Sequence, residues 1–361
     1  MANGNKYVSR RDVLKGVGGA SIAGLAGCTG GNGGGGTTTD TDTVKAAWLY
    51  NTAIQANGWT YEHHRGLEAA AEEYDWLETN YFLNVDPDDT ESVSAQYAED
   101  GYDIVYGTSF GFQDGMFNAA KDYPDTIFDH CSGFRSRDNM GRYFARLYQG
   151  FYLGGMASGM VTESNTLGYV GAFPIPEVVR WINAWTLGAA TTNPDVSVKV
   201  RWLNTWYDPT KSKDATNALA DAGADVIAHS MNSAATLETA KDRGIWGMGL
   251  YSPMREQGGD SFLTSPIWHW PEFYIPELQT VREGNWESDF DWWGFDKGLV
   301  DIADWGPEVP ESVRSEVASE REAILNGDTT VWEGSQFEGE SDTFLFSEMA
   351  SYVPNVEGEV P

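Results

Sequence analysis

Two stretches of the sequence share one pattern, and together they define the fold class. Residues 98–109 read AEDGYDIVYGTS, and residues 220–231 read ADAGADVIAHSM. In both, a helical run stops at a glycine, an aspartate follows, and an apolar run ends in small polar residues. Glycine favours the left-handed conformation that ends helices, and a strand apolar on both faces belongs in a parallel sheet covered by helices. One copy in each half of the chain predicts two similar α/β lobes.

Apolar runs and helical patterns alternate along the rest of the chain after residue 43, which favours parallel sheets with right-handed crossovers. Within residues 65–74, for example, Leu67, Ala70, Ala71 and Tyr74 share one helical face. The fold class is therefore α/β, with two doubly wound parallel sheets. We expect strands at Val44–Tyr50, Thr79–Leu83, Ile104–Tyr106, Thr126–His130, Leu167–Gly171, Val198–Trp202, Val226–Ala228 and Trp246–Leu250.

The first residues predict export. Arg10 and Arg11 stand before a weakly apolar, Gly-rich segment, which is typical of a Tat signal, and small residues precede Cys28 as in a lipoprotein cleavage site. We therefore expect a signal peptide over residues 1–27 and a lipid on Cys28. Residues 28–43 form a Gly/Thr/Asp tether with no apolar residue to bury before Val44. The protein would then sit on the outer face of the cytoplasmic membrane, attached only through its lipid.

The net negative charge of the chain limits the partners that it can bind. The chain has 54 acidic and 23 basic residues, dispersed rather than gathered in one tail. Such a surface repels nucleic acid and anionic membranes, and no nucleic-acid partner is expected. Excess surface acid on a folded chain also indicates adaptation to high salt, where screening relieves self-repulsion. With the Tat signal, this favours a halophilic archaeon.

Aromatic rings recur where the expected strands end. Asn57, Trp59 and Thr60 follow the first strand, and Ser109 and its neighbours follow the third. In the second half, similar turns bring further rings, amides and carboxylates. Ligands of parallel sheets bind beyond the carboxyl ends of the strands, so two facing lobes would form a cleft there. Flat rings with a few polar groups suit a planar heteroaromatic ligand such as a nucleobase.

Catalytic and metal signatures are not evident in the sequence. His63 and His64 are adjacent, so on a helix they diverge by about 100° and cannot chelate one metal together. They are expected on the helix surface or behind the ligand site. Cys131 is expected to be a small buried residue at a strand end. We expect no enzymatic activity, no metal and no cofactor; a surface enzyme acting on nucleosides and a ligand-presenting sensory receptor stay open as alternatives.

Five segments carry a resemblance to a known family. They read GTSFGFQDGM, RYFARLYQGFYLGGMASGM, GYVGAFPIPEVVRWINAWTLG, NTWYDPTKSKDATNAL and GADVIAHSMNSAA. In these segments the chain resembles the basic membrane protein (Bmp) family of ABC-importer substrate-binding lipoproteins, which includes purine nucleoside receptors. The resemblance covers nearly the whole chain after the tether. It implies a type I periplasmic-binding fold, a purine-like solute and an ABC permease as membrane partner.

The resemblance also implies how the lobes divide. Lobe 1 would comprise residues 44–143 and about 263–290, and lobe 2 residues 144–262 and about 291–345. Residues 346–361 would form a C-terminal tail. Hinge crossovers are expected near residues 143, 263 and 291. Ligand contacts from both lobes would stabilise a form in which the lobes are closed about these hinges.

Site residues can be carried over individually. The resemblance places Asn57 and Trp59 where relatives grip the base, and Phe173 and Glu177 in the cleft loop of the second lobe. Asn232 stands where relatives often have an acidic residue. Nucleoside-binding relatives have an acidic GxDSD-like run where this chain reads GLYSPM. They also have a lysine after the TS pair, where this chain reads TSPIWHW. Because these groups recognise ribose in relatives, a free base is favoured, and a nucleoside-like solute is the other expected ligand. Together the strand ends and the resemblance predict ligand contacts from Asn57, Trp59, Thr60, Ser109, Phe110, Phe112, Phe173, Glu177, Trp206, Asn232, Tyr251 and Trp268.

Overall fold

The structure, a computed structural model, describes residues 43–361, and Val44–Pro361 forms one compact unit. The expected signal peptide and the lipidated Cys28 lie outside the described residues. Within residues 43–361, no helix combines the length and hydropathy that are needed to cross a bilayer.

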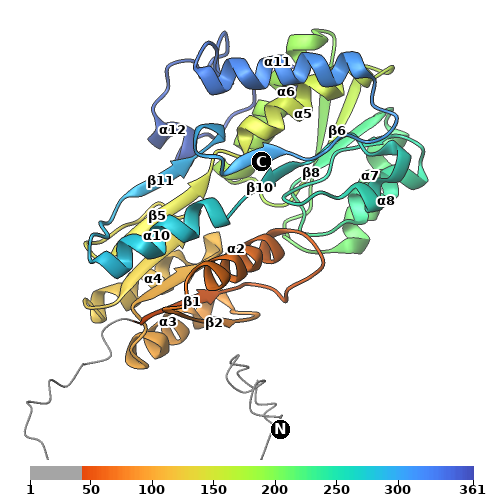
Figure 1. Cartoon of the computed structure of the whole chain (residues 1–361). Helices are drawn as coiled ribbons and strands as arrows, with labels where there is room; N and C mark the ends of the chain where they lie inside the picture. The colour runs from red at the N-terminus through yellow and green to blue at the C-terminus, as the bar shows by residue number, and fades with distance from the viewer. Residues whose placement is uncertain (1–42) are drawn as a thin grey trace, which may run out of the picture. The chain divides into compact units, whose positions relative to one another are not determined.

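A six-stranded parallel sheet, coloured red to yellow in Figure 1 with one blue edge strand, forms the first half of this unit. Its order is β11-β5-β4-β3-β1-β2, and every neighbouring pair is parallel. Apart from β4 and β5, neighbouring strands are separated in the chain by at least one helix, as crossover connections require. The strands are β1 (Val44–Leu49), β2 (Leu77–Phe82), β3 (Ile104–Gly107), β4 (Ile127–Cys131), β5 (Met140–Ala145) and β11 (Phe290–Trp293).

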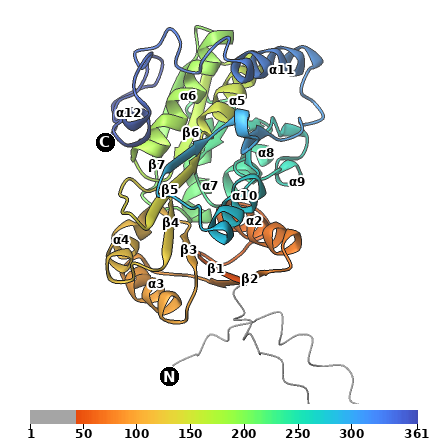
Figure 2. The ribbon, with the colours of Figure 1, turned by 60° about the vertical axis from the view of Figure 1, so that its left-hand side comes forward.

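Helices cover both faces of this first sheet (Figure 2). Successive residues of β1 point to opposite faces, so that Trp48 packs in the core beneath α2 and α10, whereas Ala47 and Leu49 pack beneath α3 and α4. This double burial explains why the strand is apolar on both faces. The helices are α2 (Trp59–Glu73), α3 (Thr90–Glu99), α4 (Gln113–Asp122) and α10 (Pro271–Glu283), with short 3-10 turns at Pro87–Asp89 and Phe110–Phe112.

A four-stranded parallel sheet in the order β7-β6-β8-β9 forms the second half. Its strands are β6 (Thr166–Gly171), β7 (Ser197–Trp202), β8 (Val226–His229) and β9 (Trp246–Gly247). Helices α5 and α6 pack on one face, and α7 and α8 contact the other. The helices are α5 (Tyr148–Val161), α6 (Pro176–Thr192), α7 (Pro209–Asp221), α8 (Ala235–Asp242) and α9 (Arg255–Gly258).

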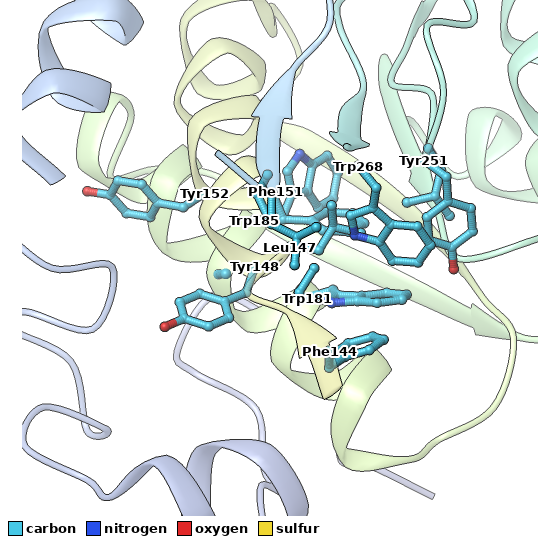
Figure 3. Close-up of a cluster of buried hydrophobic side chains, with 14 of the residues drawn as sticks. Phe144, Leu147, Tyr148, Phe151, Tyr152, Trp181, Trp185, Tyr251 and Trp268 are labelled. Carbon is cyan, nitrogen blue, oxygen red and sulfur yellow. The ribbon is translucent and has the colours of Figure 1, made fainter. Parts of the chain in front are cut away.

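Glycines let α5 and α6 approach at backbone distance. A Cβ added at Gly155 would lie 2.1 Å from the carbonyl oxygen of Trp185, and one at Gly188 would lie 2.0 Å from that of Tyr152. Any side chain at either position would force the helices apart. The resulting contact places the aromatic face of α6 firmly against α5, with Phe151 and Trp181 stacked at 5.3 Å between ring centroids (Figure 3).

The remaining elements link and cover the two sheets. β10 (Pro266–Trp268) and β12 (Val300–Ile302) pair antiparallel, α11 (Glu311–Asn326) packs on α5, and α12 (Asp342–Ser347) packs on α6. Short 3-10 turns occur at Gly259–Ser261 and Phe295–Lys297. The last residues then return to the second sheet, where Val198 donates to Asn355 at 2.7 Å and Glu357 donates back to Val198. The C-terminal segment therefore packs against the body instead of leaving it.

All eight expected strands are present, with ends shifted by at most a few residues, and the α/β class with parallel sheets is confirmed. Four strands, β5, β10, β11 and β12, were not expected. The crossovers expected near residues 143 and 291 fall inside β5 and β11, which pair with each other in the first sheet. The division into lobes at those positions stays a prediction.

Candidate ligand-binding site

Loops from the carboxyl ends of both sheets meet around a small cavity of about 10 Å³, which we call the base pocket. Such a volume holds about one water molecule, so a larger ligand can enter only when its walls move apart. The first sheet contributes residues that follow β1 and β3, and the second sheet contributes residues that follow β6, β7 and β8. The base pocket is lined by Asn51, Trp59, Ser109, Phe110, Glu177, Trp206 and Asn232.

Trp59 is the most firmly held ring of the base pocket. It opens α2 immediately after Gly58, whose φ of 93° only glycine adopts without strain. Its indole nitrogen donates to the carbonyl oxygen of Thr108 at 2.5 Å. Tyr251 and Trp268 meet the ring edge-on, at centroid distances of 5.5 and 4.9 Å. These contacts hold the Trp59 ring in place, which suits a platform on which a flat ligand stacks.

Glu177 is a buried carboxyl group in the first turn of α6, directly after Pro176. The Ser132 hydroxyl, at the end of β4, donates to its Oε2. Burial raises the pKa of Glu177 to about 7, while the hydrogen bond from Ser132 and the charge of Arg180 act in the opposite direction. At neutral pH this group can therefore either donate or accept a hydrogen bond.

Arg180 lies one helical turn after Glu177 and is fully buried. Burial lowers its pKa to about 10, although the carboxyl of Glu177 partly restores it. Its Nη1 donates to the carbonyl oxygens of Leu345 and Phe346, both at 2.8 Å. Arg180 thus fastens the C-terminal segment to the start of α6.

A second cavity, of about 250 Å³, adjoins the base pocket and shares Phe110 and Glu177 with it. We call it the side pocket. Its floor includes the polar side chains at the start of α6, and α12 forms another of its walls. The side pocket is lined by Phe110, Ser132, Phe134, Pro176, Glu177, Arg180, Phe346 and Ser347.

Of the expected contact residues, half line the base pocket: Trp59, Ser109, Phe110, Glu177, Trp206 and Asn232. Phe173 packs against Trp206, with 5.3 Å between ring centroids. Thr60 is buried behind the pocket and shares a 2.7 Å hydrogen bond with Thr52. Asn57 is half-buried in the loop before α2 and lines neither cavity.

Tyr251 and Trp268 form a buried stacked pair, 4.3 Å apart, behind Trp59. Figure 3 shows Tyr251 and Trp268 side by side, above Trp181 and Phe144. Tyr251 has a φ of 67°, an uncommon value for a bulky residue. Ser252 next to it accepts a hydrogen bond from the backbone of Gly58 and donates one to Glu62 at 2.5 Å. These contacts tie the loop before α2 to the turn at residue 251.

One expectation needs correction. Phe112 does not reach the cleft: its ring is fully buried with Leu49, Met116 and Phe128 in the core beneath α3 and α4. Phe112 follows Phe110 by two residues on the same 3-10 turn, and its side chain packs on the opposite face of the sheet.

Of the two positions expected for the histidines, His63 takes the one behind the ligand site, with 5.4 Å between the centroids of its ring and the Trp59 ring. It is fully buried because α10 packs on α2; its ring stacks on Trp270 at 4.4 Å and Nδ1 shares a 2.7 Å hydrogen bond with Tyr274. Burial lowers its pKa far below the usual range, so the ring is neutral at physiological pH. His64 is half-buried. Cys131, as expected, is buried at the end of β4.

The sequence reasoning missed several lining residues. The strand-end rule points to Asn51 after the first strand, although the predicted contacts do not include it, and it could have found Ser132 directly after β4. Arg180 lies three residues after Glu177, which places both on one face of a helix. Phe346 and Ser347 carried no usable signal, because the contacts that bring them to the pocket span about 165 residues.

A sequence model of the family described as Bmp, ABC transporter substrate-binding protein PnrA-like, matches residues 43–331. The chain belongs to the Bmp family. It is 48% identical, over the full length of both chains, to a protein of Haloferax volcanii named "Putative ABC transporter glucose-binding protein TsgA13". It is 37% identical to a purine-binding protein of Brucella abortus, over 81% of this chain and 83% of that protein.

Solved structures place this Bmp-family chain among solute-binding folds. A solute-binding protein of an ABC transporter from Aeropyrum pernix superposes with a TM-score of 0.70 at 16% identity, covering 80% of this chain and 92% of that one. A transcriptional activator of the comK gene from Bacillus halodurans gives 0.68 at 21% identity, covering 79% and 99%. The fold is thus the expected periplasmic-binding type. As a Bmp-family member, the protein is an extracytoplasmic substrate-binding protein that binds a small solute and works with an ABC permease.

Proposed function

We propose that this protein binds a purine base or nucleoside-like solute in the base pocket and delivers it to its permease. The composition of that pocket carries the proposal. Trp59, Phe110 and Trp206 offer aromatic faces, and Asn51 and Asn232 offer amides that can both donate and accept. A purine has two flat faces and an edge of alternating donors and acceptors, which this set matches. Stacking on such rings contributes about 1–3 kcal/mol per base.

Closure of the two sheets over the ligand is part of the proposal. Residues that follow strands of both sheets line the base pocket, so a ligand held there contacts both halves and stabilises their approach. The small volume of the pocket supports this mechanism, because the ligand must enter with the halves apart. The lobe boundaries given by residues 143, 263 and 291 belong to the same proposal. Scattering that shows no compaction with a bound ligand would refute it.

The site itself is proposed to comprise the base-pocket residues with Phe173, Thr60, Tyr251 and Trp268 behind them. The export route and anchor also remain proposals: a Tat signal over residues 1–27, lipid attachment at Cys28 and a high-salt habitat. Supporting observations are the twin Arg10 and Arg11, and 54 acidic against 23 basic residues. Mass spectrometry of the membrane-bound protein would detect the lipid on Cys28.

Glucose is the second candidate solute, because the Haloferax volcanii relative is named for it. Hexose sites also combine aromatic faces with carboxylates and amides, so the chemistry overlaps. The discriminating experiment is calorimetric titration of the purified protein with adenine, hypoxanthine, guanine, inosine and glucose under identical salt. The proposal predicts saturable binding of at least one purine compound and at least tenfold weaker binding of glucose. Tight binding of glucose alone would overturn it.

A further inference from the structure

The C-terminal segment lies beyond the part of the chain that the family model matches, which ends at residue 331. We call residues 342–357, which begin with α12, the strap. Figure 2 shows α12 beside α6. The side chain of Asn183, fully buried on α6, donates to the carbonyl oxygen of Ser351 at 2.9 Å and accepts from the backbone of Val353 at 3.0 Å. One buried amide thus binds the middle of the strap to the second sheet's helix.

The end of the strap pairs with the second sheet itself. Val198 of β7 donates to the carbonyl oxygen of Asn355 at 2.7 Å, and Glu357 donates to that of Val198 at 2.9 Å. The side-chain amide of Asn355 donates to the carbonyl oxygens of Pro194 and Val196, at 3.2 and 2.8 Å. All these partners lie on β7 or in the turn before it, so this end of the strap moves with the second sheet.

The start of the strap contacts the first sheet instead. Arg146 directly follows β5, and its guanidinium donates to both carboxylate oxygens of Asp342, at 2.6 and 3.1 Å. Its Nε donates to the carbonyl oxygen of Trp292 in β11 at 2.7 Å. The ring of Phe346 meets those of Phe290 and Trp292 edge-on, with centroid distances of 4.6 and 5.2 Å. The strap therefore reaches β5 and β11, the strands from which the chain leaves the first sheet for α5 and β12.

Phe346 is held by both halves of the protein at once. Its carbonyl oxygen accepts from Arg180 on α6 at 2.8 Å, while its ring, 7% exposed, packs on β11. If the two sheets move apart, one of these two sets of contacts must break. Both are kept in the compact arrangement, in which the base pocket has a volume of only about 10 Å³.

We propose that the strap joins the two sheets across their junction and holds the ligand-free protein in this compact arrangement. This rests on the closure that is part of the proposed function, but not on the identity of the solute. The fraction of molecules with the sheets apart then limits how fast a solute enters the base pocket. The strap thereby regulates solute entry by shifting the balance between the open and the compact form.

Hydrogen exchange of the Gly58 amide measures this balance in the full chain without ligand. That amide donates to the Ser252 hydroxyl in a buried hydrogen bond of 2.9 Å, which connects the loop before α2 to the turn after β9. Separation of the sheets breaks this bond, so the exchange rate rises in proportion to the open population. The Met248 amide donates to Ile227 within the second sheet at 2.9 Å and reports unfolding of that sheet.

Two variants loosen the strap from the first sheet. Phe346→Ala removes two edge-on ring pairs and is expected to raise the exchange rate of the Gly58 amide about tenfold. Asp342→Asn removes a partly exposed ion pair and should raise that rate about two- to fivefold. The exchange rate of the Met248 amide should change less than about twofold in both.

Two control variants make the same substitutions without touching the first sheet. Asp221→Asn breaks an ion pair of the same 2.6 Å length, with Arg243 at the end of α8. Phe344→Ala truncates another ring of α12, which packs on Phe337 of the C-terminal segment. Both should leave the exchange rate of the Gly58 amide within about twofold of wild type.

Wild-type exchange of the Gly58 amide in both Phe346→Ala and Asp342→Asn would overturn the role of the strap, while the proposed function stands. If Phe346→Ala also exposes the Met248 amide, Asp342→Asn decides the matter, and a rate equal to that of Asp221→Asn overturns the proposal. Failure of the proposed function is seen separately, as the absence of solute binding in the calorimetric titration.

Discussion

Replacing Glu177 by glutamine should remove a specific dependence of stability on pH. Burial raises the pKa of this carboxyl from its ordinary 4.5 to about 7 in the folded protein. Between those values the folded state binds the proton and the unfolded state does not, so wild-type stability is greatest below pH 4.5 and is lost as pH rises through 7. This difference in pKa corresponds to about 3 kcal/mol, most of which falls between pH 5 and pH 8. Glutamine cannot ionise, so the stability of Glu177→Gln does not fall in this way as the pH rises.

Urea unfolding of wild type and Glu177→Gln at pH 5 and pH 8, at constant salt, measures the effect. The difference in the free energy of unfolding between the two proteins should move by about 2–3 kcal/mol in favour of the variant as the pH rises. Other buried carboxyl groups with raised pKa values, such as Glu277 and Asp129, are present in both proteins and cancel in the difference.

Glu163→Gln serves as the control, because this carboxylate is exposed and its loss removes no buried charge. It should leave the pH dependence of wild type unchanged. The difference in unfolding free energy between wild type and Glu177→Gln could instead stay constant within about 0.5 kcal/mol between the two pH values, or move in favour of wild type. Either result would show that the effects of Ser132 and Arg180 on the pKa of Glu177 outweigh the effect of burial. The reasoning about a carboxyl group that is half-protonated at neutral pH would then be refuted.

Three further outcomes follow from the packing. Trp59→Ala should weaken purine binding about 10- to 100-fold in calorimetry, with Trp59→Phe retaining most of it, because one stacking face contributes about 1–3 kcal/mol; equal affinity of all three would exclude stacking on this ring. Gly155→Ala should lower the free energy of unfolding in urea by at least about 1–3 kcal/mol, since its Cβ meets the Trp185 carbonyl at 2.1 Å; an unchanged value would show that α5 and α6 can separate freely. Arg180→Met should expose the chain between α11 and α12 to limited proteolysis, because two hydrogen bonds to the C-terminal segment are lost; a cleavage rate equal to wild type would mean that Arg146 and Asn183 suffice.

Much of the fold could be predicted because parallel sheets leave a strong local signal. A strand such as β8 is buried on both faces and ends beside a glycine-stopped helix, so its apolar run and its limits are visible in the sequence. β5 lacks that signal, because Arg142 interrupts its apolar run. β11 is stabilised by its pairing with β5, 148 residues earlier in the chain.

In the candidate site, too, residues with a local sequence signal were predicted and residues placed by long-range packing were not. The carboxyl ends of parallel strands lie at one edge of a sheet, and this rule predicts the position of Ser109, Trp206 and Asn232, which line a common pocket. Residues whose position depends on packing between distant elements escaped it. His63 is buried only because α10 covers α2, and Ser347 reaches the side pocket only because Arg180 holds the C-terminal segment.

The most direct test of the central claim is a native mass spectrum of the purified protein after incubation with an equimolar mixture of hypoxanthine, inosine and glucose. The account predicts a one-to-one adduct with the mass of a purine compound, lost in Trp59→Ala and lost on denaturation. An adduct with glucose alone, or no adduct with any of the three, would contradict the claim that aromatic and amide side chains between the two sheets hold a purine.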